Sequence, residues 1–337
     1  MKKTLLAIAI LTSFAGAASA QSSVTVYGLL DAGITSEHGG AAGSVTKLAT
    51  GVESGNRLGF KGSEDLGNGL KANFQLENGF NLDTGTQRQG ALFGRQAYVG
   101  LSGGFGAVNL GRQYDPIFVS MDSIDPFSTG LTGSSTNLLN PGNVRTNNAI
   151  TYSSNSIQGF SANVLYGMGE VAGNNAANRT IGLSANYANG PVLVTFAYDR
   201  INAAASSSAN LKLALLGATY NFGPALVAAA YETEKSDTAA LDNRDYLLGV
   251  TVPVGPAGAF LASYMKKDDR ISNKDGKQLA VGYTYALSKR TNVYTSYARL
   301  TNEAGGASFV GDASSGGTAV LPGNTSSAFT IGVRHKF

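Results

Sequence analysis

The chain has 337 residues, of which 14% are charged, 9% are aromatic and none is cysteine. Soluble domains have about 25% charged residues, so the charged fraction is low. The lack of cysteine excludes disulfide bonds, thiolate metal sites and cysteine nucleophiles, and a net charge of only +3 argues against a nucleic-acid-binding protein.

The N-terminus has the pattern of a secretory signal peptide. Two lysines precede an apolar segment from Leu5 to Phe14, and Ala18-Ser19-Ala20 form a small-residue cleavage site. A membrane-anchoring helix is the alternative, but the apolar segment is shorter than the roughly 20 residues that span a bilayer. The pattern predicts that residues 1–20 are removed after export through the Sec pathway, and that residues 21–337 form the mature domain.

After the signal, apolar and polar side chains alternate in segments of about ten residues, the period and length of a transmembrane β-strand. From Leu70 to Glu77, apolar side chains at even positions alternate with Lys, Asn, Gln and Glu. No later apolar segment is long enough for a membrane-spanning helix. An exported chain of this kind is typical of an outer-membrane β-barrel, in which neighbouring strands satisfy every backbone polar group.

This alternation predicts an all-β, antiparallel transmembrane barrel of sixteen strands. Short turns alternate with longer loops rich in Gly, Ser and Asn, as at the periplasmic and external ends of such a barrel. Counts of fourteen or eighteen also fit, because the signal of one strand is weak. A water-soluble sandwich or solenoid would need two buried faces or a fixed repeat, which the pattern lacks. The expected strands are 24–34, 57–61, 70–77, 92–102, 107–113, 147–154, 159–168, 180–188, 192–201, 211–222, 225–233, 246–252, 259–267, 278–287, 291–300 and 327–337.

The segment from Tyr114 to Asn147 interrupts this rhythm for more than thirty residues. It contains Pro116 and Pro126, followed by Gly, Ser, Thr and Asn, which are poor residues for a strand inside a sheet. Ordered loops longer than about 15 residues are uncommon and are usually functional. We therefore expect this segment to fold into the pore and narrow it; a mobile surface loop is the alternative.

Enzyme and metal motifs are weak in this chain. It has two histidines, His38 and His335, neither of which is expected near a nucleophile, as a Ser-His-Asp hydrolase requires. Gly276-Lys277 lacks the Ser or Thr of a phosphate loop, and the residues around Asp275 lack the first and last ligands of a calcium loop. The prediction is a protein that is not an enzyme and has no catalytic residue, metal or cofactor.

Three stretches resemble the general porins of Gram-negative bacteria, most closely the trimeric porins of beta-proteobacteria. They are Val24–Gly33, Gly62–Ala72 and Gly94–Tyr114, and the resemblance continues to Phe337. It implies sixteen antiparallel strands, a homotrimer, a third external loop folded into each channel, and a terminal Phe337 that the outer-membrane assembly machinery reads. Outer-membrane lipids, lipopolysaccharide and small hydrophilic solutes and ions are the other expected partners.

The resemblance also implies a constriction in which wall arginines face an acidic loop. In anion-preferring members an arginine cluster lines the wall at the positions of Arg57, Arg95 and Arg145. The Pro-Glu-Phe loop tip of the enterobacterial branch is absent, and Asp125-Pro126-Phe127-Ser128 stands near its place. The basic candidates are Arg57, Lys61, Arg95, Arg112 and Arg145, and the acidic candidates are Glu77, Asp115, Asp122 and Asp125.

The alternation of apolar and polar residues along each strand supports some of these positions better than others. Arg57 and Lys61 alternate with apolar residues, which places them in the lumen, because an arginine facing lipid costs about 2 to 4 kcal/mol at the bilayer midplane. Arg95 and Arg112 share the parity of apolar neighbours, so either a bulge intervenes or both lie above the apolar band.

Pore width and fixed charges set the selectivity of a channel. The leading hypothesis is therefore passive diffusion of small hydrophilic solutes and ions with a mild preference for anions. A channel with a saturable site for one solute is the first alternative. A barrel that displays its loops as an adhesin or recognition surface is the second.

Overall fold

The computed structural model describes residues 23–204, 209–238, 240–303, 305–312 and 317–337. The predicted signal peptide lies outside the described residues. These residues form seventeen strands, which hydrogen bonds join into one antiparallel sheet, with helix α2 (Pro116–Ile124) and the short helix η1 (Ser135–Asn137). Among the described residues, no helix combines the length and the hydropathy needed to cross a bilayer.

Most strands have between eight and thirteen residues, and β1 is longer. Their bounds are β1 (Ser23–Gly40), β2 (Gly43–Thr50), β3 (Arg57–Gly67), β4 (Leu70–Gly79), β5 (Gln96–Gly103), β6 (Gly106–Tyr114), β7 (Arg145–Ser153), β8 (Phe160–Gly167), β9 (Thr180–Asn189), β10 (Val192–Ile201), β11 (Leu211–Asn221), β12 (Leu226–Ser236), β13 (Asp242–Val254), β14 (Gly258–Asp269), β15 (Gly276–Ala286), β16 (Thr291–Asn302) and β17 (Ser326–Lys336).

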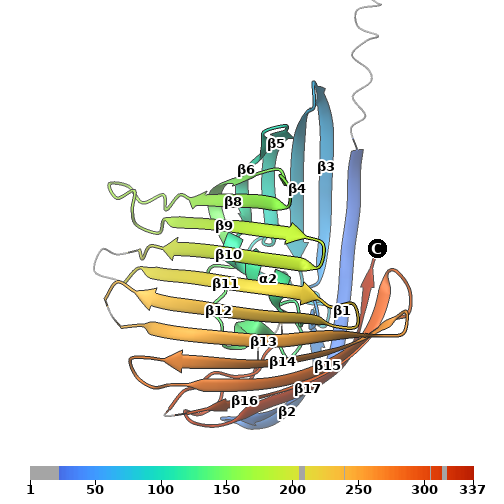
Figure 1. Ribbon diagram of the computed structural model, residues 1–337, viewed down its shortest axis with the longest axis vertical. Helices are drawn as coiled ribbons and strands as arrows, with labels where there is room; N and C mark the ends of the chain where they lie inside the picture. The colour runs from blue at the N-terminus through green and yellow to red at the C-terminus, as the bar shows by residue number, and fades with distance from the viewer. Residues whose placement is uncertain (1–22, 205–208, 239, 304, 313–316) are drawn as a thin grey trace, which may run out of the picture.

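The sheet closes on itself through β1, which pairs with β17 along one edge and with both β2 and β3 along the other. Because β2 and β3 lie end to end along β1, they act as one strand that residues 51–56 interrupt. The closed barrel therefore has sixteen strands, as predicted, and Figure 1 shows β8 to β17 side by side along one flank. The alternation of β2 was missed because its outward residues are mostly Ser and Thr.

The two faces of the barrel have opposite character, and they are reversed relative to a water-soluble protein. On β1, Val24, Val26 and Ile34 are 65%, 58% and 56% exposed on the outer face, whereas Asp31 and Thr35 are buried inside. An apolar outer face and a polar interior are what a barrel with lipid outside and water inside requires.

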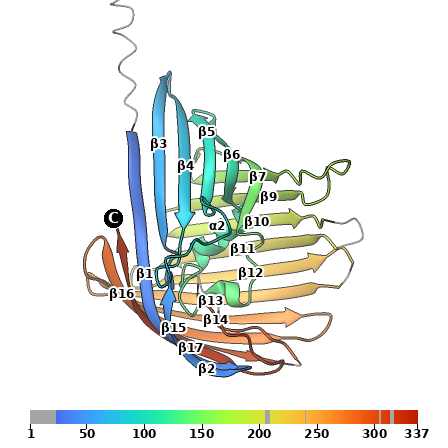
Figure 2. The same ribbon diagram turned by 180° about the vertical axis from the view of Figure 1, so that it is seen from behind.

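The long segment between β6 and β7 lies inside the barrel, where Figure 2 shows α2 surrounded by strands. The apolar side of α2, formed by Ile117, Met121 and Ile124, is buried against the inner wall of β9 to β12. The prediction of a loop folded into the lumen is thus confirmed. Full burial of such side chains stabilises the docked loop by about 1.5 to 3 kcal/mol each.

The wall behind the loop departs from the expected polar interior. Leu213 and Leu215 of β11 point inward and are fully buried, while Leu216 points outward and is exposed. Gly217 leaves room for Ile124, because a Cβ at position 217 would clash with Ile124 Cδ1. Loop and wall therefore share a dry interface, and only the opposite side of the loop faces the lumen.

Candidate functional site

A cavity of about 450 Å³ lies between the free side of the loop and the wall of β3 to β7. Residues 51–56 leave the sheet and turn inward, so they form one border of this cavity. Val52 O accepts a hydrogen bond from Leu131 N at 2.7 Å, which joins this turn to the loop. The charged residues that line the cavity are Arg57, Arg95, Arg145, Glu53, Asp122 and Asp312.

Tyr114 organises the basic side of this cavity. Its hydroxyl accepts hydrogen bonds from Arg95 Nη2, at 2.7 Å, and from Arg145 Nη2. The Arg145 guanidinium lies 4.2 Å from the centre of the Tyr114 ring, and Phe118 stacks on that ring at 5.3 Å between centroids. Two guanidinium groups are thus held at fixed positions by one aromatic residue that sequence reasoning did not select.

Arg95 faces the lumen although its parity predicted the opposite. Strand β5 begins only at Gln96, so residues 92–95 are not part of the sheet and the alternation does not extend to Arg95. Its Nε contacts Glu77 Oε1 at 2.6 Å, and both side chains are buried. Arg95 is therefore a paired and positioned arginine.

Arg57 and Lys61 both have lumen parity on β3 but lie at different depths. Arg57 lines the cavity, and its Nε donates to Gly55 O at 3.0 Å. Lys61 does not line the cavity, and its Nζ lies 5.2 Å from the centre of the Tyr27 ring. Four residues along a strand span about 13 Å, so Lys61 sits nearer the end with the short turns.

Two candidates do not fit the expected arrangement. Arg112 has the parity of the outward Leu110, and it donates to Gly94 O at 2.7 Å and to Asn147 Oδ1 at 2.6 Å, away from the cavity. Glu77 lies on the basic wall itself, where it accepts from Tyr27 and Arg95, instead of facing that wall. Parity alone does not reveal either relation, because both depend on the partners that the fold brings alongside.

The three loop aspartates have different surroundings. Asp122 is exposed to the lumen and accepts from Thr129 Oγ1 at 2.6 Å. Asp125 is buried and accepts from the backbone N–H groups of Phe127, Thr129 and Ser135 at 2.7 to 3.1 Å, so it shapes the loop. Asp115 is buried at the base of α2. Asp122 is thus the loop aspartate that faces the lumen.

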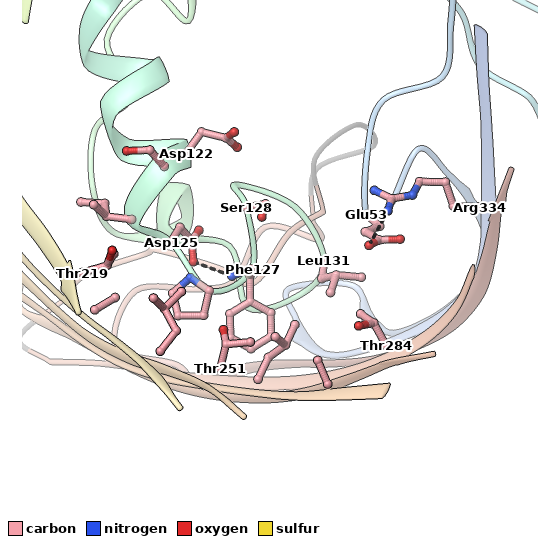
Figure 3. A pocket seen from close by; sticks show the side chains of 17 residues that line it. Glu53, Asp122, Asp125, Phe127, Ser128, Leu131, Thr219, Thr251, Thr284 and Arg334 are labelled. Atoms are coloured by element: carbon pink, nitrogen blue, oxygen red, sulfur yellow. Dashed lines mark hydrogen bonds and ion pairs between the residues drawn. The ribbon is translucent and has the colours of Figure 1, made fainter. Parts of the chain in front are cut away.

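Glu53 and Asp312 line the cavity but were not predicted. Glu53 lies on the inward turn of residues 51–56, and Figure 3 shows it beside Arg334, whose Nη2 is 3.1 Å from Glu53 Oε1. Glu53 also borders a neighbouring cavity of about 380 Å³, across which Asp122 and Phe127 project from the loop. Both residues lie between strands, and a charged residue in such a connecting segment is the sequence feature that could have indicated them.

Within the part of the chain that the structure describes, no three His, Asp or Glu side chains are grouped so that they could hold a metal ion.

Asp115 makes the loop sensitive to pH. Burial raises its pKa to about 6, from an ordinary value of 3.8, and the neighbouring charged groups are Asp199 of β10 and Arg112. Because the folded chain binds this proton more tightly than the unfolded chain, the contribution of Asp115 to stability is complete below pH about 4 and is lost as the pH rises through 6.

We expect Asp115→Asn to be more stable than the wild type at pH 8 and nearly equal to it at pH 4. Two pKa units correspond to about 3 kcal/mol, and relaxation should leave about 1 to 3 kcal/mol. The free energy of unfolding at the two pH values measures this difference. Asp122→Asn, in the same loop but exposed to the lumen, is the control, and an equal gain in both variants would contradict the assignment.

Comparison with known proteins agrees with this architecture. Residues 6–305 match the family of Gram-negative porins. An outer membrane porin protein of Bordetella pertussis is 33% identical over the whole of both chains. The anion-selective porin from Comamonas acidovorans is 31% identical and superposes with a TM-score of 0.86 over 94% of this chain and all of the other. The trimer form of an outer membrane protein of Vibrio cholerae, 15% identical, shares the fold with a TM-score of 0.70 over 94% of this chain and 99% of the other.

Proposed function

Because this chain belongs to the Gram-negative porin family and is an outer-membrane diffusion channel, we propose that Arg57, Arg95 and Arg145 give it a preference for anions. The observation that carries the proposal is the cavity beside the loop, which all three guanidinium groups line and where Tyr114 binds Arg95 and Arg145. The similarity to a porin described as anion-selective supports it.

The pairing of these arginines decides how much charge remains for a passing ion. Glu77 neutralises Arg95 at 2.6 Å. Within the described residues, neither Arg57 nor Arg145 is in an ion pair shorter than 4.0 Å. Arginine stays protonated at any working pH and binds carboxylate or phosphate in bidentate fashion. Two positive charges are therefore available to anions in the cavity beside the loop.

Acidic groups that line the same cavity add a second effect. Asp122 projects from α2 on the loop side, Asp312 also lines the cavity, and Glu53 lies there with Arg334 as its ion partner. Positive and negative walls across a narrow passage create a transverse field, which orients dipolar solutes as they pass. The preference for anions should therefore be mild, on the order of a few-fold, because fixed charges of both signs set selectivity together.

The reversal potential in a planar bilayer tests this proposal. With potassium chloride at different concentrations on the two sides, the reversal potential should have the sign expected when chloride is more permeant than potassium. Single insertions should give discrete conductance steps. A potential of the opposite sign would overturn the anion preference while leaving the channel itself intact.

The same preparations separate the two alternatives. A saturable site for one solute predicts that this solute blocks the current at low concentration. A barrel that serves mainly as an adhesin predicts no swelling of protein-loaded liposomes in neutral sugars, whereas a diffusion channel predicts swelling that slows as the sugar becomes larger.

A homotrimer is the proposed assembly, and the outer face of β17, β1 and β2 supports it. Near the long loops, this face carries hydrogen-bonded polar groups, with His38 Nδ1 2.9 Å from Ser44 Oγ and Thr46 donating to Ser36. Such a surface suits contact with protein. A mass of one or two copies in mild detergent would contradict the trimer.

Phe337 is the proposed signal for the outer-membrane assembly machinery. In the closed barrel its backbone N–H and C=O pair with Gly28 at 3.1 and 3.0 Å, and its ring lies over Gly28. Closure of the barrel thus occupies the backbone of Phe337, while its side chain stays 49% exposed. Deletion of Phe337 should lower the amount of folded protein in the membrane if the proposal holds.

A further inference from the structure

A row of basic side chains follows the outer face of the barrel where β10 to β16 meet the long loops. Each has the parity of an exposed apolar or aromatic residue on its own strand, such as Phe196, Leu248 or Leu279. Some neighbours in the row lie directly opposite each other across strands, as Arg200 and Lys212 do and as Lys266 and Lys277 do. This basic belt consists of Arg200, Lys212, Lys235, Arg244, Lys266, Lys277 and Arg299.

Tyrosines lie on the same face, nearer the middle of the barrel. Tyr231 and Tyr246 pack with ring centroids 5.1 Å apart, and Tyr264 and Tyr297 are 43% and 42% exposed. Tyrosine rings of barrels gather at the level of lipid head groups. The basic belt is therefore positioned just outside the hydrocarbon, at the level of the head groups of the outer leaflet.

A groove of about 360 Å³ opens on this face over β14 to β16. Tyr264, Leu279 and Tyr297 form its apolar part, and Lys277 and Arg299 border it. Leu279 is 60% exposed, so the groove presents an apolar surface to the acyl chains beside it. The groove thus joins a surface for hydrocarbon to two positive charges.

We propose that this groove binds a phosphorylated lipid of the outer leaflet, with an acyl chain along Tyr264, Leu279 and Tyr297 and a phosphate on Lys277 and Arg299. Arginine and lysine beside a membrane surface are the groups that recognise lipid phosphates, and their long stems lie along apolar surface while their charges stay in water.

Acidic residues near the belt offset only part of its charge, because they are fewer than its basic residues. Asp237 contacts Arg200 at 3.6 Å and also pairs with Lys212, and Glu303 contacts Lys277 at 2.6 Å. Asp242 lies 3.9 Å from Lys235, and Asp268 is opposite Arg244. Both Lys277 and Glu303 are about half exposed, and such surface pairs contribute little, so a phosphate can replace Glu303 as the partner of Lys277. Among the described residues, Arg299 is outside the ion pairs and is available to the same phosphate.

A lipid fits this surface better than a second copy of the chain. Two belts of the same sign would repel each other, whereas the face of β17, β1 and β2 carries no such charge. A free phosphate ion would leave the apolar part of the groove unused. The inference depends on the outer-membrane location and is independent of the proposed anion preference.

Binding of lipid A tests the proposal, with bisphosphorylated lipid A and its dephosphorylated form as probes. Native mass spectrometry of the intact protein released from mild detergent measures the bound fraction. The bisphosphorylated form should bind the wild type more tightly than the dephosphorylated form, and the double variant K277A/R299A should lose about tenfold or more of that affinity. The variant K289A/R290A is the matched control, because it removes two exposed basic residues from the short turn at the opposite end of β15 and β16.

Equal binding of bisphosphorylated lipid A by K277A/R299A and wild type would overturn the proposal, as would equal binding of the two lipids by the wild type. The variant K277Q/R299Q keeps polar side chains of similar length and serves if the alanine variant fails to fold. Reversal potentials of all variants should match the wild type, which separates failure of this site from failure of the constriction.

Discussion

Replacing Arg57 and Arg145 together by glutamate should turn the channel from anion-preferring to cation-preferring. Both guanidinium groups line the cavity beside the loop, and neither has a carboxylate partner among the described residues. Two unit charges about 4 Å apart interact by about 1 kcal/mol in water and by about 4 kcal/mol at an effective dielectric constant of 20. Reversing both charges should therefore change the chloride-to-potassium permeability ratio by more than about tenfold.

Neutral variants and a matched arginine make this experiment specific. The variant R57Q/R145Q should bring the permeability ratio close to one, because Arg95 remains paired with Glu77. Arg112→Gln removes one arginine from the adjacent strand that points away from the cavity, and it should leave the reversal potential unchanged. If R57E/R145E kept the wild-type potential, the selectivity would have to originate elsewhere in the lumen.

The barrel was predictable from sequence because alternation with a period of two is a direct physical requirement of a wall between lipid and water. Arg57 follows from the same rule, since it is the first residue of β3 and precedes the outward Leu58. Arg95 breaks the rule because its strand begins one residue later, at Gln96. Parity therefore predicts lumen residues only where the sheet is continuous.

The acidic side of the site was harder to predict because it depends on tertiary contacts. Asp115, Asp122 and Asp125 have the same chemistry, yet one is buried below the helix, one faces the lumen and one accepts three backbone N–H groups. Glu53 reaches the cavity only because residues 51–56 leave the sheet and meet the loop at Leu131. No local pattern distinguishes these outcomes.

The dry interface between loop and wall explains how the loop is held on one side of the lumen. Ile117, Met121 and Ile124 hold α2 against β9 to β12, on the side away from the arginines. The loop tip is fixed separately, through Thr132 with Ser296 at 2.8 Å and Asn137 with Gln278 at 2.8 Å. The position of Asp122, and so the width of the site, depends on this docking.

Introducing a charge into that interface should release the loop and widen the pore. Ile124 is 2% exposed, so Ile124→Lys would bury an ammonium group without a partner, at an effective cost of several kcal/mol. This cost exceeds the about 1.5 to 3 kcal/mol that one buried apolar side chain contributes. The strand pairs do not involve Ile124, so the barrel should still close, and single-channel conductance should be larger and noisier than in the wild type.

Val119→Lys provides the matched control, because it places the same new lysine on the opposite side of the same helix. Val119 is 51% exposed and lines the lumen cavity, where an ammonium group keeps its water. Trypsin cuts after lysine and should cut Ile124→Lys in the released loop but leave Val119→Lys intact while α2 is docked. The prediction is wrong if both variants resist cleavage and Ile124→Lys keeps the wild-type conductance. The loop would then stay docked with a charge in the interface, so the apolar side of α2 would not be what holds it.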